Sequence, residues 1–217
     1  MDHIKIMKLK EGKPLLRDKI YYVFLFCVFF IFPFYISKFS GKDFFYQSIF
    51  IFSLVIFLCI SIIYHNFSYN DDDDFDEEEF NYYRLLDHLF ILVLMMGCFT
   101  PVIGKYYGIK HLLFLWLFTL IGMYGIYKRK NYKSLKTIII YIILGLLFLP
   151  YLYKSRSKFT TKETNIFYFI LVLKVFELYI YKAEKPNLIR NYFEFHELLH
   201  LISIVTFSLI IYINYNI

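Results

Sequence analysis

Seven long apolar segments constrain the fold of this chain more than any other feature. Each is roughly 17–23 residues long, which is the length of helix that crosses a hydrocarbon layer of about 30 Å. A helix in a soluble protein keeps a polar face over such a length, whereas these segments mostly do not. They predict an all-α fold, a polytopic membrane protein built as a seven-transmembrane helix bundle. The segments cover about residues 20–37, 44–66, 82–103, 111–127, 137–153, 165–181 and 195–214.

Composition and charge support a membrane protein and predict its orientation. Hydrophobic residues make up 59% of the 217 residues and charged residues 19%, against about half and about a quarter in soluble domains. An N-terminus in the cytosol places 15 Lys and Arg in cytosolic segments and eight on the opposite side, as the positive-inside rule favours. We therefore expect residues 1–19 to form a basic cytosolic N-terminus, followed by one transmembrane domain over 20–214.

The first apolar segment ends in no small-residue cleavage site, so we expect it to be retained as a membrane anchor. The basic residues lie beside the membrane ends, where they meet anionic lipid head groups. Membrane lipid, and not nucleic acid, is therefore the predicted partner. The sequence leaves the organelle and the oligomeric state open.

One low-complexity run, from Asp71 to Glu79, lies in a predicted cytosolic loop over 67–81. A block of like charges is typical of a solvated, disordered segment. Transient collection of cations near a neighbouring site is the alternative function of such a run.

Five polar residues mark the ends of three segments: Ser61, His65, Asp87, His196 and His200. With seven spans, the end of the second, the start of the third and the start of the seventh lie on one side of the membrane. Ser61 and His65 are four residues apart, as are His196 and His200, so each pair shares one helical face. All five side chains are therefore expected to meet at one end of the bundle.

Three imidazoles with a fourth position left to water are typical of a catalytic Zn²⁺ site. Zinc lowers the pKa of its bound water to about 7. A neighbouring carboxylate can accept a proton of that water, and a hydroxyl can support it. We expect His65, His196 and His200 to bind the metal and Asp87 and Ser61 to act in catalysis. A single histidine at a helix end is more often a hydrogen bonder, but three with a carboxylate favour a site.

Other polar residues leave alternatives open. The sequence from His196 to His200 also fits the H-E-x-x-H pattern of metalloproteases, with Glu197 as general base, although acidic residues favour the first turn of any helix. His88 points about 100° away from Asp87 on a helix and is not expected to be a ligand. Lys174 and Glu177 are expected to pair with each other, with a substrate contact as the alternative.

The motifs together resemble the hemolysin III family, a branch of the progestin and adipoQ receptor family that is related to the alkaline ceramidases. The resemblance covers about residues 60–217 and rests on several spaced segments. These are Ser61-Ile62-Ile63-Tyr64-His65, Leu86-Asp87-His88, Gly97-Cys98-Phe99-Thr100-Pro101, Lys185-Pro186-Asn187 and Phe195-His196-Glu197-Leu198-Leu199-His200.

The resemblance implies zinc held by His65, His196 and His200, with Ser61 and Asp87 supporting the bound water, and a cytosolic N-terminus. The acidic insert at 71–79 departs from the family pattern, and the short N-terminus argues against a hormone receptor. Three functions remain open: a zinc-dependent hydrolase of a membrane lipid amide or ester, such as ceramide; a pore-forming, cytolytic hemolysin; and an H-E-x-x-H intramembrane metalloprotease.

Overall fold

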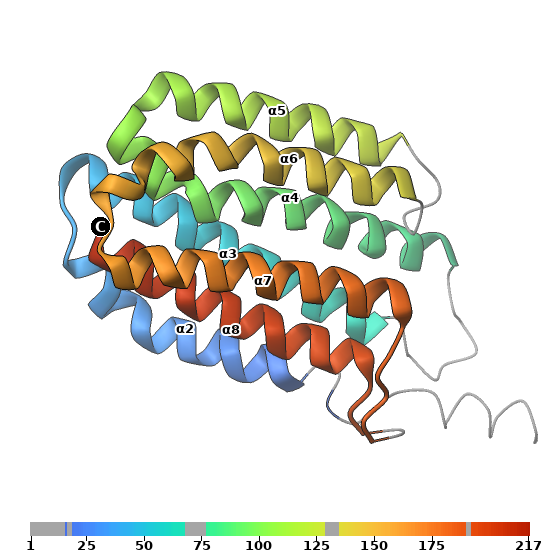
Figure 1. The fold of residues 1–217 in the computed structure, drawn as a ribbon. Helices are drawn as coiled ribbons and strands as arrows, with labels where there is room; N and C mark the ends of the chain where they lie inside the picture. The colour runs from blue at the N-terminus through green and yellow to red at the C-terminus, as the bar shows by residue number, and fades with distance from the viewer. Residues whose placement is uncertain (1–15, 17–18, 68–76, 129–134, 190–191) are drawn as a thin grey trace, which may run out of the picture.

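The computed structural model describes residues 16, 19–67, 77–128, 135–189 and 192–217, and within these residues the fold is a bundle of α-helices lying side by side (Figure 1). Successive helices run in opposite directions, so their ends collect at two faces of the bundle. A 3₁₀ turn, Arg156–Lys158, follows α6. The helices are α2 (Lys19–Ser37), α3 (Gly41–Phe67), α4 (Glu77–Tyr107), α5 (Ile109–Tyr127), α6 (Leu135–Ser155), α7 (Thr161–Ala183) and α8 (Phe195–Asn216).

Each of the seven predicted segments lies within one of these helices, and the prediction of an all-α polytopic membrane protein is confirmed. Six described helices are long and apolar enough to cross a membrane, namely α2, α3, α4, α5, α6 and α8. The exception is α7, which carries Lys174 and Glu177 in its middle. At 1.5 Å per residue its 23 residues still span about 34 Å, and it lies alongside the other helices (Figure 1).

The predicted loop between the second and third spans is shorter at both ends than expected. Phe67 belongs to α3, and α4 already begins at Glu77. Acidic residues such as Glu77, Glu78 and Glu79 are favourable at a helix N-terminus because they oppose its positive end. Residues 68–76, with most of the acidic run, and residues 1–15 of the predicted basic N-terminus lie outside the described residues.

The most extensive contact in the bundle is between α3 and α4. Glycines on α4 allow this close approach: Gly97 lies against Ser53 of α3, and Gly104 lies against the ring of Tyr46. Small residues at helix contacts are the usual way in which membrane helices pack, since burial away from lipid gives little driving force. The contact fixes α3, which carries Ser61 and His65, against α4, which carries Asp87.

The remaining helices pack around this pair: α2 against α3 and α8, α7 against α8, and α5 and α6 against α4. Buried polar side chains tie the start of α3 to its neighbours. Tyr35 of α2 donates to Gln47 Oε1 (2.5 Å), Gln47 Nε2 donates to the carbonyl of Asn214 (2.8 Å), and Asn214 Nδ2 donates to the carbonyl of Cys98 (3.2 Å). The helix α2 is thus tied to α3 and, through α3, to α8.

Candidate metal centre

The three predicted ligand histidines converge at the end of the bundle where α2 and α8 begin and α3 ends. His65 lies in the last turn of α3, while His196 and His200 lie in the first two turns of α8. One nitrogen of each ring can be chosen so that all three atoms lie within 4.8 Å of one another. His65 and His200 are each only 5% exposed. The group is therefore compact and almost closed to the surroundings.

The distances within this group suit a shared metal ion. Two Zn–N bonds of about 2.0–2.1 Å at a tetrahedral angle place their nitrogens about 3.4 Å apart. The Nε2 atoms of His65 and His196 are 3.2 Å apart, and the His200 ring centre lies 4.9 Å and 4.5 Å from the other two. Imidazole nitrogens are favoured ligands of zinc and of other first-row transition metals. The three histidines could thus hold a metal ion.

Asp87 of α4 lies near Ser61 of α3, which is 2% exposed. Asp87 Oδ1 is buried and has no hydrogen-bond partner among the described residues. A buried polar atom without a partner is uncommon and points to a bound water or ion. Asp87 does not belong to the compact histidine group, which suits contact with a water molecule better than direct ligation.

Tyr21, a residue that the sequence did not indicate, completes the surroundings of His200. Its ring stacks on the His200 ring, with centroids 4.0 Å apart and planes within 7°. Tyr21 lies in the first turn of α2 and is 3% exposed. Nothing in the sequence distinguishes it among the chain's 22 tyrosines, because the contact joins helices nearly 180 positions apart.

The carboxylate of Glu197 has a structural partner at the start of α8. It is fully buried, and its Oε2 accepts a hydrogen bond from the backbone N–H of Glu194 (2.8 Å), closing a capping box. Asn187, in the loop before α8, accepts a hydrogen bond from the N–H of Phe195 (3.1 Å). These two bonds satisfy backbone donors that a helix start would otherwise leave open. The capping bond gives Glu197 a structural role at the start of α8.

Two further sets of polar residues lie outside the histidine group. His88 Nδ1 is hydrogen-bonded to the hydroxyl of Tyr141 on α6 (2.8 Å), and His88 is not among the three histidines that could share a metal. Lys174 pairs with Glu177 (2.7 Å), as expected from their spacing, and Glu177 also accepts a hydrogen bond from Ser203 of α8.

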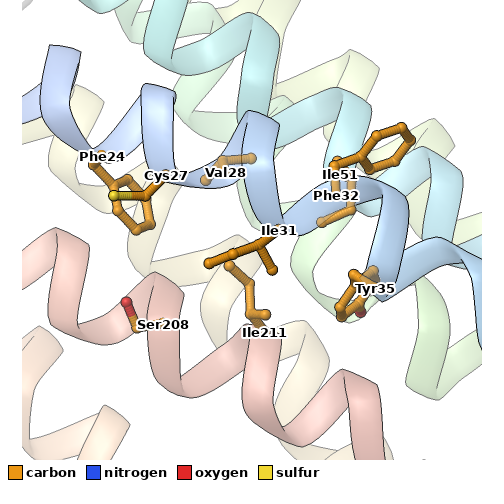
Figure 2. A pocket seen from close by; sticks show the side chains of 9 residues that line it. All are labelled: Phe24, Cys27, Val28, Ile31, Phe32, Tyr35, Ile51, Ser208 and Ile211. Atoms are coloured by element: carbon orange, nitrogen blue, oxygen red, sulfur yellow. The ribbon is translucent and has the colours of Figure 1, made fainter.

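A hollow of about 180 Å³ lies between α2, α3 and α8 (Figure 2). Its lining is almost entirely apolar and includes none of the five predicted site residues. The hollow therefore belongs to the apolar flank of the bundle and not to the histidine group. The lining residues are Phe24, Cys27, Val28, Ile31, Phe32, Tyr35, Ile51, Ser208 and Ile211.

Fold and site together define a class: a helical, multi-pass membrane protein with three histidines gathered inside one end of its bundle. Within that class, the chain belongs to the haemolysin-III related family, which it matches over residues 19–210. This range runs from the start of α2 into α8 and contains all five predicted site residues. The family predicted from the spaced motifs is confirmed. No curated protein sequence matches the chain.

Proposed function

We propose that this chain is a zinc-dependent hydrolase that cleaves an amide or ester bond of a membrane lipid, with ceramide as the type of substrate. The approach of His65, His196 and His200 within 4.8 Å is the observation that carries this proposal. It is supported by the buried Asp87 Oδ1, which has no hydrogen-bond partner among the described residues, and by apolar helices long enough to span a membrane, the surroundings in which a lipid substrate lies. Zinc bound there would polarise the substrate carbonyl and lower the pKa of a water molecule.

The residues of the chain have distinct roles in this reaction. Asp87 Oδ1 accepts a proton from the attacking water as its oxygen bonds to the carbonyl carbon, and Asp87 then returns the proton to the leaving amine or alcohol. Ser61, which lies near the Asp87 carboxylate, supports its position. His65 and His200 are buried, whereas His196 is half-buried and marks the side from which a substrate reaches the reacting centre.

Metal content of the detergent-purified protein tests the site. We expect about one zinc per chain in the wild type, loss of this zinc in His65→Ala, and retention in His111→Ala. His111 is the matched control, since it lies at the start of α5 beside Tyr151 and belongs to no histidine group. A wild type without zinc, or equal zinc content in His65→Ala, would contradict the proposed site.

Turnover of a ceramide-like lipid tests the chemistry separately from the metal. Asp87→Asn is expected to retain zinc but to lose turnover, because the amide cannot accept the proton. Glu197→Gln keeps an oxygen for the helix cap and is expected to retain turnover. The opposite pattern, with activity lost in Glu197→Gln and kept in Asp87→Asn, would favour the metalloprotease hypothesis instead.

The positive-inside distribution leads us to propose that the site lies at the cytosolic face. His200 contacts Tyr21 in the first turn of α2, so the site and the N-terminal end of α2 share one side of the membrane. A single cysteine introduced at residue 2, in a variant with Cys27, Cys59 and Cys98 replaced, should react with an impermeant maleimide only after the cells are permeabilised. Labelling of intact cells would reverse this orientation.

A further inference from the structure

Tyr21 contacts the metal centre through one face of its ring. The stacking on His200 is close and nearly parallel, at 4.0 Å and 7°, and aromatic pairs of this kind contribute about 0.5–1.5 kcal/mol beyond the burial of their area. On its other sides the His200 ring meets the rings of His65 and His196 at steep angles. The Tyr21 ring therefore limits rotation of the His200 ring about its side-chain bonds.

Tyr21 is itself held from two directions. The ring of Phe57 on α3 meets it edge-on, with centroids 6.1 Å apart. Tyr21 and Phe57 belong to one buried core cluster. The Tyr21 ring is therefore packed between Phe57 of α3 and His200 of α8.

Ligand histidines generally depend on neighbouring groups that set their ring orientation, and loss of these groups typically lowers metal affinity about 10–100-fold.

We propose that Tyr21 is a positioning residue for the metal centre, whose ring orients the His200 ring from α2. This inference rests on the proposed function only in taking the histidine group as a metal site. Through this contact, α2, which carries none of the three histidines, takes part in setting the metal affinity.

Zinc affinity of the full-length protein in detergent, measured by competition with a chelator, tests the proposal. We expect Tyr21→Leu to weaken zinc binding about 10–100-fold, and Tyr21→Phe, which keeps the stacked ring, to weaken it much less. The matched control is Tyr35→Leu. Tyr35 lies on the same helix, is equally buried at 3% and belongs to the same core cluster, but it lies at the far end of α2.

Two outcomes of this experiment would overturn the proposal. One is zinc binding by Tyr21→Leu as tight as that of the wild type. The other is an equal loss of zinc affinity in Tyr35→Leu, which would show that any large-to-small substitution in this core cluster weakens zinc binding. The visible spectrum of the cobalt-loaded protein provides a second readout: it should change in Tyr21→Leu, because ligand geometry changes, and stay constant in Tyr35→Leu.

The metal-free protein tests the same contact without reference to zinc. In protein with ¹³C-labelled histidine, ring protons of His200 that lie over the Tyr21 ring should be shifted upfield, with the signal assigned by its loss in His200→Ala. Tyr21→Phe should keep the shift and Tyr21→Leu should remove it. Equal shifts in the wild type and Tyr21→Leu would refute the positioning role. Absence of zinc from the wild type would refute the proposed function, and the ring-proton shifts would still show whether Tyr21 orients His200.

Discussion

Replacing Gly97 by alanine tests how closely α3 and α4 must pack to hold the site. A Cβ atom at Gly97 would lie 2.5 Å from the Cβ of Ser53 and 2.6 Å from its Oγ, whereas ordinary contact begins at 3.4 Å. The two helices would have to separate locally by about 0.9 Å. Overpacking of this kind costs about 1–3 kcal/mol. Without a clash, the same change inside a helix stabilises by about 0.5–1 kcal/mol. The sign of the change in the free energy of unfolding therefore shows whether the clash with Ser53 occurs.

Two variants control this experiment. Gly145→Ala on α6 makes the same chemical change where the nearest atom, the Cε of Met95, is 4.0 Å away, and it should be neutral or slightly stabilising. Adding Ser53→Gly to Gly97→Ala removes both clashing atoms and should recover much of the lost stability. Thermal unfolding in detergent measures the effect, at about 2–4 °C per kcal/mol for a chain of this length.

The same variants report on the metal centre. Ser61 follows Ser53 by eight residues on α3, and Asp87 precedes Gly97 by ten on α4, so separation at this contact also moves the Ser61 hydroxyl away from the Asp87 carboxylate. Gly97→Ala is expected to lose turnover before it loses zinc, because all three ligands lie on α3 and α8. A rise in melting temperature for Gly97→Ala, or no recovery in the double variant, would refute the reasoning.

Three further predictions concern the polar contacts of the bundle. Glu197→Ala removes a helix-capping bond and should lower stability by about 0.5–2 kcal/mol in thermal unfolding; an unchanged melting temperature would contradict the capping role. Tyr35→Phe leaves the buried Gln47 amide oxygen without its donor and should cost about 1–3 kcal/mol, with zinc content unchanged. Asp43→Asn breaks the half-exposed contact with Lys105 and should change stability by less than about 1 kcal/mol, a limit that the same unfolding measurement checks.

Much of the fold could be predicted because the membrane imposes a simple rule on the sequence. A segment in lipid must form a helix, because only hydrogen bonds within the segment satisfy its backbone there. To cross the hydrocarbon layer, the helix needs about 20 mainly apolar residues, so the spans are visible in the sequence as apolar segments. Their ends were less visible. The helix α4 runs from Glu77 to Tyr107 and α7 from Thr161 to Ala183, beyond the apolar segments, because polar residues continue a helix once it leaves the hydrocarbon layer.

The histidine group could be predicted for a different reason. Pairs of residues four apart, such as His196 and His200, need only helical geometry to share a face, and the parity of the spans places His65 at the same end. The contact of Tyr21 with His200 could not be predicted, since a tyrosine inside an apolar helix carries no signal of what it contacts. The Lys174–Glu177 pair was visible from its spacing, but the hydrogen bond from Ser203 to Glu177 required the packing of α7 on α8.

The placement of the histidines at the ends of α3 and α8 affects the charge that a bound ion would experience. His65 lies in the last turn of α3 and His196 in the first turn of α8. A helix carries about half a negative charge at its C-terminus and half a positive charge at its N-terminus. The positive N-terminal end of α2 lies at the same place, since Tyr21 in its first turn stacks on His200. One negative and two positive helix ends therefore meet around the histidines and provide no net negative charge for a cation. The carboxylates of Asp87 and of the buried Glu197, which follows His196, would then have to offset the charge of a divalent ion.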